Sequence, residues 1–313
     1  MLDSAAAAGH VAVDLGKTTC RLRIVVDSSV TEFVGPGAPG FASHRGADRA
    51  FESFDGLLAK APADLLDGVR AIGIGAAGAD ADETAVRDVA ERVRARWGWD
   101  VVITSDVVTA HLGALEGAPG TVLIAGTGAV AARVDDDGTW SRSDGWGPWL
   151  GDEGSGRWLG QEGLVAALRA VDGRGPSTSL ESDVRALAPD IVTIPRVITG
   201  ESDVARSLAS FAPVVLRRAA EGDRVATQIA ERAVEHLVAT VASVTPVNGS
   251  VSIVGGLTEN TAFLGALTAG LAERGLRYVP PAGSALDGAA MLAVSHDLIH
   301  ERNAIRDTLH VPR

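Results

Sequence analysis

Cysteine and lysine are both scarce in this chain of 313 residues. The single cysteine, Cys20, excludes an intramolecular disulfide and any zinc or iron–sulfur site that needs several cysteines of one chain. The seven histidines occur without an HExxH motif or another paired spacing, which favours surface or packed positions over a transition-metal site. The two lysines are Lys17 and Lys60, so a lysine within a motif is informative.

Positive charge is also in deficit. The chain has 28 Lys and Arg against 40 Asp and Glu, and no basic block interrupts this acidity. Nucleic acid and anionic membrane are therefore not expected as partners. The first residues lack the basic start and long apolar core of a signal peptide, and no apolar run is long enough to cross a bilayer, so we expect a cytoplasmic protein.

The order of apolar runs and turn residues in the first half predicts a three-stranded meander followed by alternating helices and strands. This alternation is typical of parallel strand pairing in an α/β fold. The expected strands are 11–14, 21–26, 30–34, 69–75 and 101–105, and the expected helices are 43–60, 82–96 and 107–116.

The second half begins with another meander, which has a Gly/Thr turn between its first two strands. Such an internal repeat predicts two similar lobes, each with a phosphate-friendly turn in its first hairpin, that face one another across a central cleft. The expected strands are 121–126, 130–134, 139–144 and 251–256, and the expected helices are 156–171, 225–244, one from about Thr258 and a last one at 285–299.

These elements predict two domains, which 46% hydrophobic residues can supply with separate cores. The first lobe is expected at 1–112, completed by a C-terminal helix at 284–305. The second is expected at 113–283, with a helical insertion at about 160–245. The apolar face of the helix at 225–244 is expected to pack within its own domain, with a dimer interface as the alternative.

The stretch VAVDLGKTTCRLRI contains Gly16-Lys17-Thr18, three residues typical of a P-loop. A P-loop needs a glycine five residues before Gly16, where valine stands, and a following helix, where CRLRIVV predicts a strand. The remaining pattern is Asp14-x-Gly16-x-Thr18 in a hairpin. Glycine lets the backbone approach an anion, Thr18 offers a hydroxyl and an N–H, and Asp14 can hold Mg²⁺ through water. Taken alone, the same residues are equally typical of a plain turn.

The order of several motifs resembles the sugar-kinase branch of the actin/hexokinase/heat-shock-chaperone ATPase superfamily. More closely, it resembles the N-acetylglucosamine kinase and benzoyl-CoA reductase activator-type ATPase family, and GDEGSGRWLG followed by DGRGPST resembles bacterial glucosamine kinases. The resemblance runs over residues 10 to 300 and implies two ribonuclease H-like lobes that use ATP and Mg²⁺. The motifs are DxGxT, GIGAAG (73–78), TSD (104–106), AGTGAV (125–130), GWGPWLGDEGSGRWLG (145–160) and VGG (254–256).

The resemblance implies a nucleotide site made by short segments of both lobes. Many relatives carry glycine where Lys17 stands, so this lysine places a point charge near the β- and γ-phosphates unless its side chain is solvated. The implied ATP-binding residues are Asp14, Gly16, Lys17 and Thr18 in the first phosphate loop, Thr127 and Gly128 in the second, and Gly255 and Gly256 in the adenosine loop.

The resemblance also implies that Asp106 is the catalytic base, which orients the sugar hydroxyl and takes its proton. Asp106 follows a strand and precedes a helix, so it is equally suited to be the N-cap of that helix. The two roles are compatible, because the carboxyl ends of such strands line the cleft. The resemblance further places Mg²⁺ at Asp14 and Asp106, partly through water, and places Gly78 beside the substrate.

The segment Gly151-Asp152-Glu153-Gly154 stands where the family binds its sugar. A carboxylate can accept hydrogen bonds from two vicinal hydroxyls, and a protonated amino group at C2 would add a charge-assisted bond. We therefore expect Asp152 and Glu153 to contact the substrate. In the alternative interpretation they are acids at a helix N-terminus, with Ser155 as its cap.

Two neighbouring features bear on the identity of the sugar. Relatives that bind N-acetylglucosamine often carry serine and a polar residue where Ala129 and Val130 stand here, so this chain lacks a hydrogen-bond partner for that sugar. Trp146, Trp149 and Trp158 either pack on sugar faces or form part of the core at the domain hinge.

The resemblance therefore implies an ATP-dependent kinase of the 6-hydroxyl of glucosamine, with N-acetylglucosamine or another hexose as the alternative acceptor. It also implies a homodimer. An activator ATPase is disfavoured, because an iron–sulfur cluster shared between subunits needs more than one buried cysteine. A sugar-sensing regulator is disfavoured as well, because the residues before Asp14 leave no room for a DNA-binding module.

Overall fold

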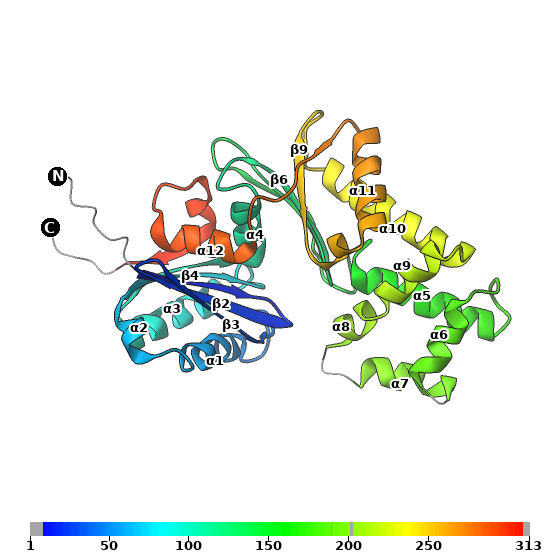
Figure 1. Cartoon of the computed structure of the whole chain (residues 1–313), viewed down its shortest axis with the longest axis horizontal. Coiled ribbons are helices and arrows are strands. Elements are labelled where there is room, and N and C mark those ends of the chain that lie inside the picture. Colours follow the sequence, from blue (N-terminus) through cyan, green and yellow to red (C-terminus); the bar gives the residue numbers. More distant parts are fainter. Residues whose placement is uncertain (1–8, 189, 201–202, 309–313) are drawn as a thin grey trace. The chain divides into compact units, whose positions relative to one another are not determined.

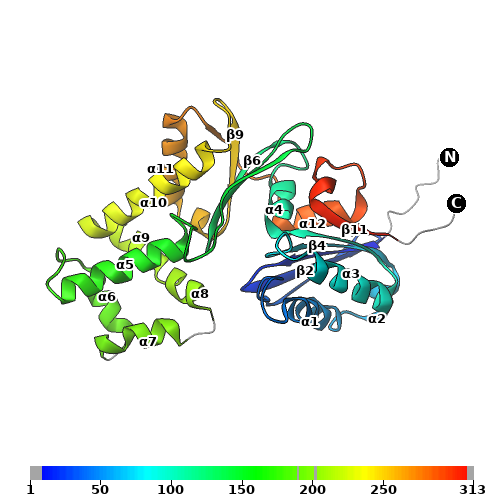
Figure 2. The same ribbon diagram turned by 180° about the vertical axis from the view of Figure 1, so that it is seen from behind.

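The computed structural model describes residues 9–188, 190–200 and 203–308. Its contacts divide the chain into two compact units, whose elements are drawn in Figures 1 and 2. The boundary expected between residues 112 and 113 falls inside helix α4 (Asp106–Ala114), whereas the contacts place it after Pro119. Unit 1 comprises Met1–Pro119, Val134–Trp140 and Pro281–Arg313, and unit 2 comprises Gly120–Arg133 and Ser141–Pro280.

Unit 1 is built on a six-stranded sheet with the order β11-β5-β4-β1-β2-β3. The three central strands β1, β4 and β5 are parallel, while β2, β3 and β11 run antiparallel to their neighbours. The meander and the parallel alternation that the sequence predicts are both present. The strands are β1 (Gly9–Leu15), β2 (Thr19–Val26), β3 (Ser29–Pro36), β4 (Val69–Ala76), β5 (Asp100–Ser105) and β11 (Ala304–Asp307).

Helices cover both faces of this sheet (Figure 1). Val11 and Val13 belong to the apolar cluster under α1 and α3, whereas Ala12 between them contacts α12, because side chains alternate along a strand. Cys20 is fully buried in the first cluster, and this burial raises the pKa of its thiol to about 11. The helices of unit 1 are α1 (Gly46–Leu58), α2 (Ala63–Asp67), α3 (Glu83–Trp97), α4 and α12 (Ala285–Val294).

Helices α4 and α12 approach each other closely because glycines line their contact. A Cβ on Gly113 would lie 1.8 Å from the Ser284 carbonyl oxygen, and a Cβ on Gly288 would lie 2.0 Å from the Thr109 carbonyl oxygen. Neither distance is compatible with a side chain. The small residues at the start of α12 therefore fix the position of α4, the helix that begins at Asp106.

The end of the chain differs from the expected helix at 285–299 and from the C-terminal helix placed at 284–305. Helix α12 ends at Val294, and Ser295 is extended. After a 3₁₀ turn (Ile299–Asn303), the chain forms β11, which pairs antiparallel with β5. The pairing of β11 with the edge of β5 satisfies backbone hydrogen bonds through a contact between distant segments that the local pattern does not reveal.

Two buried histidines join α4 to this C-terminal segment. His111 Nδ1 lies 2.9 Å from His300 Nε2, and neither side chain is exposed. One hydrogen between two ring nitrogens requires that at least one imidazole be neutral. Burial, and after it the charge of the facing His111, lower the pKa of His300 to about 4.

The contribution of His300 to the stability of the protein is expected to fall as the pH drops from about 6.5 towards 4. His300 has an ordinary pKa of 6.5, against about 4 when folded, so the unfolded chain binds the proton first. The stabilising contribution of neutral His300 is complete above pH 6.5 and lost below about pH 4. The shift of its pKa corresponds to about 3 kcal/mol of unfolding free energy. Denaturant unfolding at about pH 7.5 and about pH 4.5 measures it.

The matched variants are His300→Gln and, as the control, His44→Gln at an exposed position. We expect the difference in unfolding free energy between wild type and His300→Gln to shrink in acid, and His44→Gln to follow wild type at both pH values. An equal difference at both pH values would contradict the assignment.

Unit 2 contains a five-stranded sheet with the order β10-β9-β6-β7-β8. Strand β9 is parallel to both β6 and β10. The meander predicted for the second half is present in the neighbouring strands β6, β7 and β8. The strands are β6 (Gly120–Ala125), β7 (Ala129–Val134), β8 (Trp140–Asp144), β9 (Ser250–Val254) and β10 (Arg277–Tyr278).

One apolar cluster joins this sheet to the helices of unit 2. The predicted apolar face of the helix at 225–244 lies in that cluster, with Ala226, Ala233 and Leu237 fully buried. This face therefore packs within its own unit, as expected. The helices are α5 (Gly156–Val171), α6 (Leu180–Leu187), α7 (Ile194–Thr199), α8 (Val204–Ala209), α9 (Ala212–Ala220), α10 (Arg224–Ala242) and α11 (Thr261–Glu273), with 3₁₀ turns at Ile191–Thr193 and Gly256–Glu259.

The DGRGPST segment between α5 and α6 is anchored to α10 through one carboxylate. Asp223 is the N-cap of α10 and also accepts hydrogen bonds from Thr178 Oγ1 at 2.9 Å and from the Ser179 backbone N–H at 2.6 Å. Burial raises the pKa of Asp223, but these hydrogen bonds outweigh it and lower the pKa to about 2. The segment is therefore a structural connection between helices.

Among the described residues, the helices are all too short or too polar to span a membrane.

Candidate active site

The turn between β1 and β2 is held from behind by the segment that follows β3. Gly37 N donates to the Thr18 carbonyl at 3.0 Å, and Ala38 N donates to the Gly16 carbonyl at 3.2 Å. A Cβ on Gly37 would lie 2.2 Å from the Gly16 carbonyl oxygen, so only glycine fits at this contact. In the part of the chain that the structure describes, the N–H groups of Lys17 and Thr18 have no protein acceptor. They are left for solvent or an anion.

Asp14 lies beside this turn, between two neighbouring strands. It is opposite Gly75 of β4 on one side and Arg21 of β2 on the other. Burial raises the pKa of Asp14, while Arg21, whose Nη1 lies 3.3 Å from Asp14 Oδ2, opposes this rise. Because the side chain of Arg21 is 57% exposed, it is a weak partner that a ligand in solution can replace.

Asp106 is the first residue of α4 and does not act as its N-cap. Ser105 takes that place and accepts a hydrogen bond from Val108 N. The carboxylate of Asp106 accepts a hydrogen bond from the Val107 backbone N–H and keeps acceptor capacity for a substrate. Burial, and after it the negative charge of Asp14, raises its pKa, while the hydrogen bond from Val107 lowers it. With smaller effects of Asp80, which raises it, and Lys17, which lowers it, the pKa lies at about 6. A carboxylate with this pKa can accept a proton near neutral pH.

Unit 1 thus gathers Asp14, Lys17 and Asp106 into one electrostatic cluster, together with Asp80, which the sequence motifs did not suggest. Asp80 follows the central strand β4, just after the turn at Gly78, whose φ of 72° suits glycine. The next aspartate, Asp82, is the N-cap of α3. An aspartate between a central strand end and a helix cap was the signal that could have identified Asp80.

The segment predicted as the second phosphate loop, Gly126-Thr127-Gly128, contacts the first turn of α5. Gly156 N donates to the Gly126 carbonyl at 2.8 Å, and Arg157 N donates to the Thr127 carbonyl at 3.1 Å. Ser155 is the N-cap of α5, as the helix interpretation expects, but Asp152 and Glu153 precede the helix. The cap that the helix interpretation predicts is thus present, with the two acids just before it.

Asp152 lies against the second phosphate loop. Its Oδ1 is 3.3 Å from Ala129 N, and a Cβ on Gly128 would lie 3.0 Å from its Oδ2. Glu153 Oε2 is instead 3.5 Å from His236 Nδ1 of α10. Unit 2 thus brings Thr127, Gly128 and Asp152 together, whereas the side chain of Glu153 contacts His236.

The three tryptophans near this segment have different environments. Trp158 is buried in the core of unit 2 and packs against His236, with ring centroids 5.0 Å apart. Trp146 and Trp149 are 71% and 74% exposed, so they do not belong to the core. The guanidinium of Arg142 lies 5.4 Å from the ring centroid of Trp146.

The two glycines predicted for the adenosine loop differ in whether their surroundings leave room for a side chain. Gly255 has a φ of 106°, and a Cβ there would lie 2.5 Å from the Ala125 carbonyl oxygen. The end of β9 therefore lies against the end of β6 with room for glycine alone. A Cβ on Gly256 would meet nothing within 4 Å, so its surroundings do not require glycine.

The donor set fits a magnesium ion that arrives with a nucleotide. Among the described residues, no three His, Cys, Asp or Glu side chains form a complete metal cage. Asp14 and Asp106 nevertheless belong to one cluster, and Mg²⁺ is commonly held by one or two carboxylates with phosphate oxygens and water. The open hairpin amides beside Asp14 suit those phosphates.

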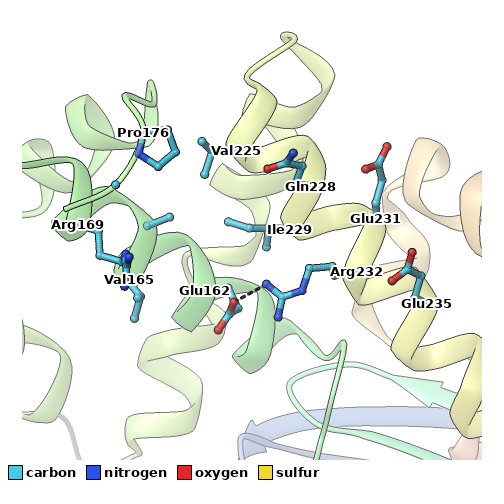
Figure 3. A pocket seen from close by; sticks show the side chains of 12 residues that line it. Glu162, Val165, Arg169, Pro176, Val225, Gln228, Ile229, Glu231, Arg232 and Glu235 are labelled. Atoms are coloured by element: carbon cyan, nitrogen blue, oxygen red, sulfur yellow. Dashed lines mark hydrogen bonds and ion pairs between the residues drawn. The ribbon is translucent and has the colours of Figure 1, made fainter. Parts of the chain in front are cut away.

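A separate pocket of about 500 Å³ lies between α5 and α10 (Figure 3). Its side chains carry charges of both signs, and the Glu162–Arg232 ion pair, at 3.0 Å, joins the two helices. None of the residues that the sequence predicts for nucleotide or sugar lines it. This pocket is therefore distinct from the residues gathered above.

Solved structures resemble this chain over almost its whole length. A Chromobacterium violaceum protein, provisionally described as an N-acetylglucosamine kinase, has a TM-score of 0.78 at 25% identity, with 92% of this chain and 99% of that chain covered. A Porphyromonas gingivalis protein with the same provisional description has a TM-score of 0.73 at 17% identity, with 94% and 99% covered. The ROK hexokinase from Thermus thermophilus has a TM-score of 0.53 at 18% identity, with 91% and 97% covered.

These likenesses confirm the expected fold class of two actin/hexokinase-like α/β lobes. A comparison with curated protein sequences found no match. The model of the BadF/BadG/BcrA/BcrD ATPase family, by contrast, matches residues 11–293, which include all the candidate site residues described above. The chain therefore belongs to the BadF/BadG/BcrA/BcrD ATPase family.

Proposed function

We propose that this protein is an ATP-dependent kinase that phosphorylates the 6-hydroxyl of glucosamine. The observation that carries the proposal is the cluster around Asp106, whose pKa of about 6 suits a base acting on a sugar hydroxyl. Membership of an ATPase family supports the use of ATP. The likeness to a protein provisionally described as an N-acetylglucosamine kinase supports a sugar as the acceptor.

In this proposal, Asp106 orients the 6-hydroxyl and takes its proton. The hydroxyl oxygen bonds to the γ-phosphorus as the bond to the bridging β,γ-oxygen breaks, which yields the sugar phosphate and ADP. The free amides of Lys17 and Thr18 hold phosphate oxygens, and the Lys17 ammonium adds a positive charge. Asp14 and Asp106 would hold Mg²⁺, partly through water, which when bound neutralises phosphate charge.

Unit 2 supplies the remaining contacts in this proposal. Thr127 and Gly128 hold phosphate oxygens, and the backbone of Gly255 and Gly256 lies against the adenosine. Asp152 and Glu153 bind the sugar. Gly78 of unit 1 lets the backbone approach the same substrate.

The choice of an amino sugar rests on charge. Carboxylates at residues 152 and 153 would attract a protonated C2 amino group. Ala129 and Val130, both buried in β7, offer no side-chain hydrogen bond to an N-acetyl group. N-acetylglucosamine is the second candidate, favoured by the provisional description of the Chromobacterium protein.

ADP release by the purified protein tests the proposal. It is measured with ATP and Mg²⁺ in the presence of glucosamine, N-acetylglucosamine, glucose or no sugar. We expect release to depend on sugar and to be fastest with glucosamine. Faster release with N-acetylglucosamine would favour the second candidate, and release that no sugar changes would refute both.

Lys17→Ala is expected to raise the KM for ATP about tenfold, because it removes a charge-assisted contact to phosphate. Steady-state kinetics at saturating sugar measure this change. Lys60→Ala, which removes the other lysine from an exposed position, is the matched control and should behave like wild type. Because Lys17 lowers the pKa of Asp106, its loss should also move the acidic limb of the rate profile to higher pH. An unchanged KM would mean that the Lys17 side chain is merely solvated.

A further inference from the structure

One carboxylate closes the segment that joins β8 to α5. Strand β8 ends at Asp144, whose Oδ1 accepts a hydrogen bond from Asp152 N at 2.8 Å and whose Oδ2 accepts one from Glu153 N at 2.9 Å. Each carboxylate oxygen thus accepts one hydrogen bond from a backbone amide of the acidic pair, Asp152 and Glu153. Residues 145–151 are thereby a loop whose two ends meet at Asp144.

The backbone at both ends of the loop adopts a conformation that needs support. Asp144 has a φ of 61° and Asp152 a φ of 56°, in the left-handed region, which is uncommon for residues other than glycine although aspartate adopts it more readily than most. A Cβ on Gly151 would lie 2.2 Å from Asp144 Oδ1, so the loop closes tightly on this carboxylate.

Burial of side chains does not hold the loop in place. Trp149 and Leu150 are 74% and 86% exposed, so the loop gains little from the hydrophobic effect. Further contacts of the loop include hydrogen bonds from Arg142 to the Asp144 and Gly145 carbonyls, from Arg157 to the Gly151 carbonyl and from Gly151 N to the Gly147 carbonyl. The backbone amides of the acidic pair are held by Asp144, while Asp152 also accepts hydrogen bonds from Ala129 N and Ser155 N.

We propose that Asp144 is a positioning residue for the acceptor sugar. It acts through Asp152 and Glu153, whose backbone it orients, without contacting the sugar itself. This inference rests on the proposed function, because it takes these two acids to face the sugar. The predicted second phosphate loop is held by hydrogen bonds from Gly156 and Arg157 besides the contact of Asp152 with Ala129 N. Loss of the Asp144 carboxylate should therefore affect the nucleotide contacts much less than the sugar contacts.

The test is Asp144→Asn, which keeps the size of the side chain. An amide has one acceptor oxygen and one NH₂ donor, so one of the two backbone N–H groups would face a donor. We expect the KM for glucosamine to rise about tenfold to a hundredfold. The KM for ATP and the midpoint of thermal unfolding should stay close to wild type, a split that a general structural defect would not produce.

Asp137→Asn is the matched control, because Asp137 also accepts a backbone hydrogen bond in a turn, from Thr139 N at 2.9 Å. It should leave all three quantities unchanged. An unaltered KM for glucosamine in Asp144→Asn would overturn the inference. A parallel loss of ATP affinity and thermal stability would overturn it as well.

Hydrogen exchange of the Asp152 and Glu153 amides, measured without substrate, separates this inference from the proposed function. We expect faster exchange at these two amides in Asp144→Asn than in wild type. Unchanged exchange would overturn the positioning role whatever the kinase assay shows. If wild type releases no ADP with any sugar, the proposed function fails. The exchange result then still shows whether Asp144 orders the backbone of Asp152 and Glu153.

Discussion

Asp106→Asn is expected to lower kcat for sugar phosphorylation by roughly 10²- to 10⁴-fold, the range that a positioned general base contributes. The amide keeps the shape of the side chain but cannot take the hydroxyl proton at the operating pH. The KM for the sugar should change little, because the lost interaction belongs mainly to the transition state. Single-turnover kinetics with saturating ATP and sugar measure the chemical step directly.

The pH profile adds a second signature of the same residue. Asp106 must be ionised to accept a proton, and burial together with the charges of Asp14 and Asp80 raises its pKa to about 6. The wild-type rate should therefore fall about tenfold per pH unit below this value. The raised pKa also means that ionised Asp106 opposes folding above pH 6, so Asp106→Asn should be at least as stable as wild type in neutral solution.

Asp297→Asn serves as the control, because Asp297 is an exposed aspartate of the same unit. It should retain the wild-type rate and pH profile. Turnover close to wild type in Asp106→Asn would show that this residue is not the base. An inactive variant that is also much less stable than wild type would instead point to a structural role.

Gly288→Ala is expected to lower the unfolding free energy by about 3 kcal/mol, the upper part of the range for overpacked contacts. Its new methyl group would lie 2.0 Å from the Thr109 carbonyl oxygen and 2.7 Å from the Gly113 amide nitrogen. Both neighbours are backbone atoms of α4, so relief requires a shift of one helix. Urea unfolding followed by circular dichroism measures the change.

Gly56→Ala provides the matched control. Gly56 also lies inside a helix, α1, but a Cβ there would meet nothing within 4 Å. Replacing a helical glycine by alanine should then stabilise the protein by about 0.5 to 1 kcal/mol. If Gly288→Ala and Gly56→Ala shifted stability in the same direction, the close packing of α4 and α12 would be wrong.

The elements that position the site were predictable because they have long, regular patterns. Strands β1, β4 and β5 each have an uninterrupted apolar run at their centre (11–13, 71–76 and 101–103), as strands buried on both faces do, and α10 shows an apolar face at helical spacing. β10 and β11 were not predicted. They have two and four residues, and their pairing with β9 and β5 depends on distant segments rather than on local pattern.

The candidate site was predictable to the extent that its residues stand in motifs. The structure brings Asp14, Lys17 and Asp106 together in unit 1, and brings Thr127, Gly128 and Asp152 together in unit 2. The contacts that tune these residues were not predictable. The effect of Asp80 on the pKa of Asp106 and the hydrogen bonds of Asp144 to the amides of Asp152 and Glu153 arise from the folded geometry. Neither contact has a characteristic spacing in the sequence.

The identity of the phosphorylated product tests the central claim most directly. The protein is incubated with ATP, Mg²⁺ and glucosamine, and the product is examined by mass spectrometry and by ¹H–³¹P correlation spectroscopy. We predict one hexosamine phosphate for each ADP released, with its phosphorus coupled to the protons on C6. Release of inorganic phosphate in place of a sugar phosphate would contradict the proposal and leave an ATPase without a sugar acceptor.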